Sequence, residues 1–158
     1  LAGGFADGTF RNGGEVTRGQ FAAWLWTMFG RPSGSTPHDF ADVGGGTLFN
    51  DAISWAKAEG IVNGFLGGTV FRPREPINRA QIAQWLRIAA GGSDSAPPNG
   101  FVDVPDGAWY EASVNWARDA GVVSGFAGNQ YRPTATATRG QAANMFLATA
   151  TWFNAQPT

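Results

Sequence analysis

The strongest constraint on the fold of this 158-residue chain is an internal repeat of about sixty residues. The segment 40–43 (FADV) returns as 101–104 (FVDV), an offset of 61 residues, and the same offset joins Trp55 to Trp116. A third copy is visible in three arginines separated by 61 and 60 residues: Arg18, Arg79 and Arg139. Three matching copies predict one small structural unit repeated along the chain.

Each repeat is predicted to form a helix, a Gly-rich loop and a second helix. Apolar residues at i, i+4 and i+7 indicate first helices over residues 50–59 and 111–120. Gly60 and Gly121 follow them, where a left-handed C-terminal cap is expected. The second helices begin with a capping box, an N-cap residue followed by Gln at the third helical position. The N-cap residues are Thr17, Asn78 and Thr138.

Behind each capping box runs an apolar stripe, which includes Leu25, Leu86 and Phe146 in turn. A single stripe cannot bury itself, so the three second helices are expected to pack together. The sequence therefore predicts an all-α, mainly helical fold with Gly-rich loops, arranged as a pseudo-threefold bundle of helix-loop-helix repeats. We expect the second half of a first repeat at 1–31 and two full repeats at 38–92 and 99–153.

Composition narrows the functional class. Hydrophobic residues make up 43% of the chain, which indicates a folded protein. The formal net charge of −1 argues against nucleic-acid binding. The chain has no Cys and no apolar run long enough for a transmembrane helix, so we expect neither disulfides nor membrane insertion. Because it begins at Leu1 without a signal-like stretch, we expect a mature or trimmed fragment.

The repeated motifs resemble the S-layer homology repeat. They are Phe-x-Asp-Val, Trp-Ala-x-x-x-Gly-Val, Gly-Phe followed by Tyr-Arg-Pro, and Thr-Arg-x-Gln, and the last repeat is similar to actinobacterial copies. The resemblance implies a pseudo-trimer whose grooves bind secondary cell-wall polysaccharide, often with pyruvylated N-acetylmannosamine. It also implies a non-catalytic anchor of a secreted Gram-positive surface protein. The family often reads Thr-Arg-Ala-Glu, whereas this chain has Gln20, Gln81 and Gln141.

The candidate binding residues are the three repeated arginines, each predicted at the first helical position. There a guanidinium and helix amides converge, which suits the carboxylate of an acidic sugar. The alternative is a structural ion pair with Asp42 or Asp103 of a neighbouring repeat. The two aspartates could accept sugar hydroxyls, or else cap a turn or hold an arginine.

Two further groups of residues are candidates. Trp55 and Trp116 could offer a flat face to a sugar ring, although a Trp on a short amphipathic helix is more often core. Gly4, Gly64 and Gly125 are expected to permit a positive φ or a close backbone approach, in a loop that the resemblance implies lines the groove. His38 stands alone in a linker, so no metal site or cofactor is predicted.

No nucleophile–base signature is present, and Asp42 and Asp103 are copies of one position, which favours repeated binding over divided acid and base roles. The sequence therefore predicts a protein that is not an enzyme. Its expected partner is cell-wall polysaccharide, at the extracellular surface. The alternative is a structural protein–protein assembly module, in a surface layer or a viral or envelope particle, that binds other chains and no sugar.

Overall fold

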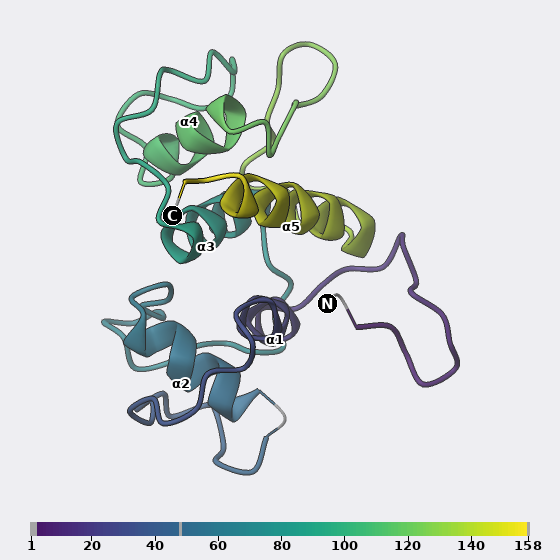
Figure 1. Cartoon of the computed structure of the whole chain (residues 1–158), viewed down its shortest axis with the longest axis vertical. Coiled ribbons are helices and arrows are strands. Elements are labelled where there is room, and N and C mark those ends of the chain that lie inside the picture. Colours follow the sequence, from purple (N-terminus) through teal and green to yellow (C-terminus); the bar gives the residue numbers. More distant parts are fainter. Residues whose placement is uncertain (1–2, 48, 158) are drawn as a thin grey trace. The chain divides into compact units, whose positions relative to one another are not determined.

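The computed structural model describes residues 3–47 and 49–157. Within these ranges it contains five helices: α1 (Arg18–Met28), α2 (Asn50–Ala58), α3 (Arg79–Ala90), α4 (Glu111–Asp119) and α5 (Arg139–Asn154) (Figure 1). The β-type pairing of the described residues consists of isolated bridges such as Phe65 with Val70. The mainly helical class predicted from the sequence is confirmed.

The three capping boxes are present at the predicted positions. Thr17, Asn78 and Thr138 each accept a hydrogen bond from the amide of the Gln three residues on, and each Gln side chain accepts one from the N-cap amide. Glutamine thus satisfies the same backbone groups as the glutamate that the family often carries, because only the side-chain oxygen is used. α1, α3 and α5 therefore begin where the sequence predicts.

The ends of α2 and α4 also follow local rules. Gly60 and Gly121 adopt φ of 69° and 71° just after the helices, and glycine has no Cβ to clash in this left-handed conformation. The helices end at Ala58 and Asp119, one residue before the predicted ends, since Glu59 and Ala120 serve as C-caps.

The chain divides into two compact units, Leu1–Ile77 and Asn78–Thr158. In the first, α1 packs on α2; in the second, α3 packs on both α4 and α5. The boundary falls inside the predicted second repeat, because the second helix of one repeat docks on the loop of the next. In the first unit the amides of Arg18 and Gly19 donate to the carbonyls of Glu75 and Pro73. The bundle of all three second helices stays a prediction.

The predicted stripes supply much of the buried surface. Leu25, Leu86 and Phe146 are all fully buried, whereas Met28 at the end of the first stripe is half-buried. No helix in the described part of the chain has both the length and the apolar character needed to cross a bilayer.

Candidate arginine sites

The second unit contains a cluster of two arginines and two aromatic rings, here called the third-repeat arginine cluster: Arg79, Phe126, Tyr131 and Arg132. Arg79 Nε donates to the Tyr131 carbonyl at 2.8 Å, and the Tyr131 hydroxyl donates back to the Arg79 carbonyl at 2.8 Å. The guanidinium carbon of Arg79 lies 4.6 Å from both ring centroids, and that of Arg132 lies 4.3 Å from the Phe126 ring. Two cations thus share one phenyl ring.

The first unit repeats this geometry in the second-repeat arginine cluster: Arg18, Phe65, Phe71 and Arg72. Arg18 Nε donates to the Phe71 carbonyl at 2.8 Å. The guanidinium carbons of Arg18 and Arg72 lie 4.5 Å and 4.4 Å from the Phe65 ring. The arrangement therefore belongs to the repeat and is not an accident of one loop.

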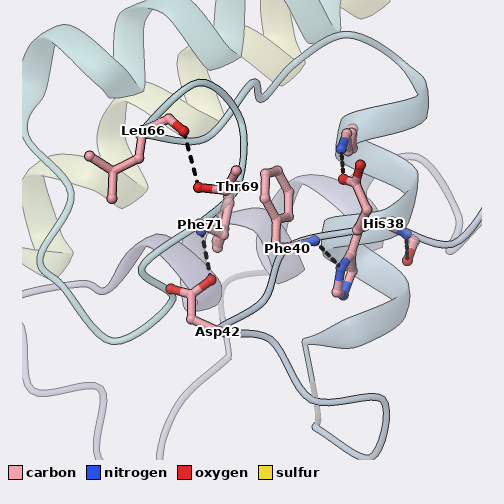
Figure 2. A network of polar contacts seen from close by, with 9 residues as sticks. His38, Phe40, Asp42, Leu66, Thr69 and Phe71 are labelled. Carbon is pink, nitrogen blue, oxygen red and sulfur yellow. Dashed lines mark hydrogen bonds and ion pairs between the residues drawn. The ribbon is translucent and has the colours of Figure 1, made fainter.

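The second arginine of each cluster has a left-handed backbone, with φ of 60° at Arg72 and 59° at Arg132. A carboxylate holds this unusual conformation. Asp42 accepts the amides of Phe71 and Arg72 at 2.8 and 2.7 Å, and Figure 2 shows the first of these bonds. Asp103 accepts the amides of Tyr131 and Arg132, both at 2.8 Å. The aspartates of the repeated Phe-x-Asp-Val motif thus fix the loop.

Arg72 and Arg132 were not among the sequence candidates. The available signal was the aromatic-Arg-Pro triplet, which recurs at 71–73 and 131–133. The arginine of this triplet becomes a candidate only from the structure, which places the guanidinium of Arg72 on the same ring as that of Arg18, and the guanidinium of Arg132 on the same ring as that of Arg79.

The helix amides near Arg79 are already bonded to protein. The amides of Arg79 and Ala80 donate to the carbonyls of Ala135 and Pro133, and that of Gln81 donates to Asn78 Oδ1. The first turn of α1 is satisfied in the same way. An acidic ligand would therefore meet the arginine side chains and not the first-turn amides.

Arg79 is 5% exposed, yet no described residue bonds or ion-pairs with its two terminal nitrogens. Among the described residues, Trp116 Nε1 is the side-chain atom that is buried from solvent and has no hydrogen-bond partner, and the Arg79 nitrogens are not in this category. The terminal nitrogens of Arg79 consequently reach solvent. They are donors held in place by the Nε bond and the two rings.

Burial lowers the pKa of the more buried arginine in each cluster, Arg18 and Arg79. It lowers the pKa of Arg18 to about 10, with Glu75 opposing and Arg72 adding to the shift. It also lowers the pKa of Arg79, where Tyr131 and Asp103 oppose and Arg132 adds. Both groups remain cationic at neutral pH. A desolvated cation beside a second cation gains more from an incoming anion than a fully hydrated one does.

A groove of about 580 Å³ lies beside the second-repeat arginine cluster. Phe49 and Pro73 give it apolar walls, and two arginines and two carboxylates give it charge: Arg72, Arg74, Asp42 and Glu75. Arg72 Nη1 lies 3.7 Å from the Glu75 carboxylate. The groove therefore combines an apolar surface with charged groups of both signs.

The two candidate tryptophans lie in the core. Trp55 is 4% exposed and its ring centroid lies 5.5 Å from that of Phe29. Trp116 is 2% exposed and meets the Trp152 ring edge-on at 5.3 Å. Rings buried to this degree offer no open face to a sugar in this structure, so their geometry favours the packing role over the binding role.

The candidate glycines differ from one another. Gly64 and Gly125 have φ of 73° and 81°, and an added Cβ at either would overlap an aromatic ring, Phe40 or Phe101. At Gly4 an added Cβ would lie 3.0 Å from the Thr9 carbonyl oxygen, a close approach without an unusual backbone. Gly64 and Gly125 therefore show both of the predicted features, a positive φ and a close approach of neighbouring atoms.

The remaining candidates are Arg139 and His38. Arg139 begins α5 and is 3% exposed. His38 Nδ1 accepts the Phe40 amide at 3.2 Å (Figure 2), and its Nε2 lies 3.0 Å from Asn50 Oδ1. In the third repeat Asn99 Oδ1 accepts the Phe101 amide in the same way. Residues 3–47 and 49–157 contain no cluster of three or more His, Cys, Asp or Glu suited to a metal.

Replacing Asp42 by Asn is expected to lower the free energy of unfolding by about 1–2 kcal/mol at neutral pH, because one loop amide loses its acceptor. Burial acts to raise the pKa of Asp42, but the bonds from the Phe71 and Arg72 amides outweigh it, so the folded-state pKa is lowered. The carboxylate therefore stabilises the fold fully above its unfolded pKa, near 3.9, and this contribution is lost as pH falls through the lower folded value.

Urea denaturation across the acidic range measures both effects. The Asp42→Asn variant should lose less stability on acidification than the parent. Asp106→Asn, at an exposed acid, serves as the control and should behave like the parent. Equal neutral-pH stability of Asp42→Asn and the parent would show that the carboxylate does not hold the loop.

Comparison with known proteins places the chain in a family. The profile of the S-layer homology domain matches residues 39–83 and 100–143, more than half of the chain. Over 148 residues the chain is 25% identical to exoglucanase XynX of Acetivibrio thermocellus, covering 89% of this chain and 13% of that protein. Over 151 residues it is 25% identical to an amylopullulanase of Thermoanaerobacterium thermosulfurigenes, covering 89% and 8%.

The chain belongs to the S-layer homology domain family. Domains of this family are non-catalytic modules that anchor proteins to the cell wall, which associates them with the cell surface. The chain spans about a tenth of the length of the two enzymes it resembles, so their catalytic names describe those longer proteins.

Proposed function

We propose that this chain anchors a secreted surface protein of a Gram-positive bacterium by binding an anionic secondary cell-wall polysaccharide. The observation that carries the proposal is the way in which the Arg79 side chain is held. Its Nε is fixed by the Tyr131 carbonyl, while its terminal nitrogens have no protein partner among the described residues and reach solvent. A guanidinium held in this way is preorganised for a carboxylate, because little side-chain freedom is lost on binding.

The third-repeat arginine cluster suits a sugar with an acidic substituent, such as pyruvate. Arg79 would bond the carboxylate with its planar fork, and Arg132, beside the same Phe126 ring, would add a second positive charge. In the second-repeat cluster, Arg72 and the groove walls Phe49 and Pro73 would play the equivalent part. Asp42 and Asp103 would act indirectly, by holding the loops that present Arg72 and Arg132.

The test is a sedimentation assay with purified native cell wall. The chain should co-sediment with the wall, and chemical removal of the acidic substituents should release most of it. Enzymatic removal of uncharged wall components that leaves the acidic polysaccharide in place is the control and should leave binding intact.

Two outcomes would contradict the proposal. Undiminished binding to wall stripped of its acidic groups would exclude the arginine mechanism. Failure to bind native wall at all, together with self-association of the chain, would favour the alternative of a protein assembly module without sugar binding.

A further inference from the structure

The linker between α1 and α2 forms an arch over the start of α2, here called the linker arch: residues 32–37. Both ends are pinned within the first unit. Trp26 Nε1 donates to the Pro32 carbonyl at 2.9 Å, and the His38 amide donates to Ser54 Oγ at 3.2 Å. His38 is also bonded to Asn50, in the first turn of α2. The arch is therefore fixed at a set distance from the helix.

Beneath the linker arch is a pocket of about 200 Å³. Its walls are the arch itself and the side chains of Trp26, Asn50, Asp51 and Ser54. This volume is below the roughly 300–1,000 Å³ of pockets for drug-sized ligands. It has room for one ring-sized group and not for an oligosaccharide.

The polar groups in this pocket have unused bonding capacity. Ser54 is 5% exposed, and although its Oγ accepts from His38, no described residue accepts its hydroxyl proton. Asp51 accepts only from Asn50 Nδ2, at 3.2 Å, and has no cation within ion-pair distance among the described residues. A buried donor and a carboxylate acceptor thus face the same space as the Trp26 indole.

The equivalent segments of the second unit show that this pocket is not required by the fold. At the positions of Trp26, Asp51 and Ser54 they have Arg87, Ala112 and Asn115. Asn115 Oδ1 still accepts the amide of the linker residue Asn99, at 2.9 Å. Arg87 is itself engaged, with Nε on Ser113 Oγ at 3.0 Å and Nη1 on the Gly92 carbonyl at 3.3 Å. The pinned linker is kept, and the aromatic, acidic and small residues are not.

We propose that the pocket under the linker arch binds a single neutral sugar ring, at a site separate from the arginine clusters. Asp51 would accept hydroxyl protons, Ser54 would donate its own, and the Trp26 indole would contact the apolar C–H face of the ring. The Asp51 carboxylate disfavours an acidic sugar, because a second negative charge would be repelled. The site therefore takes uncharged hexoses or N-acetylhexosamines.

The experiment follows the ¹⁵N-labelled chain by NMR during titration with glucose, galactose, N-acetylglucosamine and N-acetylmannosamine. At least one of these should shift the Trp26 indole N–H and the amides of Ser33 and Ser35. Glucuronic acid, the charged counterpart, should leave these signals in place. If no neutral sugar shifts them, or if glucuronic acid shifts them equally, the proposal is wrong.

Ser54→Asn is the decisive variant, since it introduces the side chain that the third repeat already has. The larger amide fills the pocket but keeps an acceptor for the His38 amide, so the fold should be retained. The affinity for the neutral sugar should fall on the order of tenfold or more. Asp51→Ala, again the third-repeat residue, should weaken binding severalfold.

Neither variant should change sedimentation with acidic cell wall, so this proposal and the proposed anchoring function can fail separately. Unchanged sugar affinity in folded Ser54→Asn would place the sugar elsewhere on the chain and overturn the assignment.

Discussion

Replacing Gly64 by Ala is expected to lower the free energy of unfolding by about 2–5 kcal/mol. Two costs add at this position. A left-handed backbone, here with φ of 73°, costs an L-residue roughly 1–2 kcal/mol. The new Cβ would also lie 2.6 Å from the Val70 carbonyl oxygen and overlap the Phe40 ring, and such overpacking costs about 1–3 kcal/mol. This loss is a large part of the total stability of a small protein.

Gly67, in the same loop, supplies the matched control. Its φ is 69°, but an added Cβ would have no neighbour within 4 Å, so Gly67→Ala should incur the backbone cost alone. Urea denaturation of both variants separates the two contributions. Equal destabilisation by Gly64→Ala and Gly67→Ala would show that the contact of the loop with Phe40 and Val70 is looser than described.

Replacing Arg79 by Ala is expected to weaken wall binding tenfold to a hundredfold. Hydrogen bonds to a charged group contribute roughly 1.5–3 kcal/mol when partly shielded from water, and 1.4 kcal/mol corresponds to a factor of ten. Arg79→Lys should recover only part of the affinity. A lysine keeps the charge but loses the fork geometry and the fixed Nε bond to Tyr131.

Arg79 also holds the Tyr131 loop, so a change in binding could follow from a change in stability. Arg132→Asn separates the two effects. It removes a charge from the same cluster at an exposed position, and Asn tolerates the left-handed conformation found there. It should weaken binding with little change in the melting temperature. Arg118→Ala, at an exposed arginine of α4 outside the cluster, should leave wall binding unchanged.

Thermal melts accompany the binding assay for every variant. A folded variant that carries both Arg18→Ala and Arg79→Ala, and so alters both arginine clusters, would refute the arginine mechanism if it bound wall as the parent does. The assembly function would then become the leading explanation for the repetition of the motif along the chain.

The sequence by itself determined the helices and their caps. A capping box involves residues three positions apart, and a glycine C-cap involves only the last turn of a helix. These interactions are complete within a short segment, so Thr17, Asn78 and Gly60 could be assigned without knowing what surrounds them. The repeated motifs added the resemblance to the S-layer homology repeat, and the expected non-catalytic anchoring role came with that resemblance.

Only the tertiary structure decided which groups are left for a ligand. Arg18 and Phe71 are 53 residues apart, and the bond between them depends on one repeat docking against the next. That docking places Arg72 and Arg132 in the clusters. It also pairs the first-turn helix amides with loop carbonyls, so these amides are not open to a ligand. The two aspartates accept hydrogen bonds from loop amides. The same long-range packing buries Trp55 and Trp116. Local sequence patterns specify the helices and their caps. The exposure of a side chain and its hydrogen-bond partners depend instead on contacts between distant segments, which no short pattern contains.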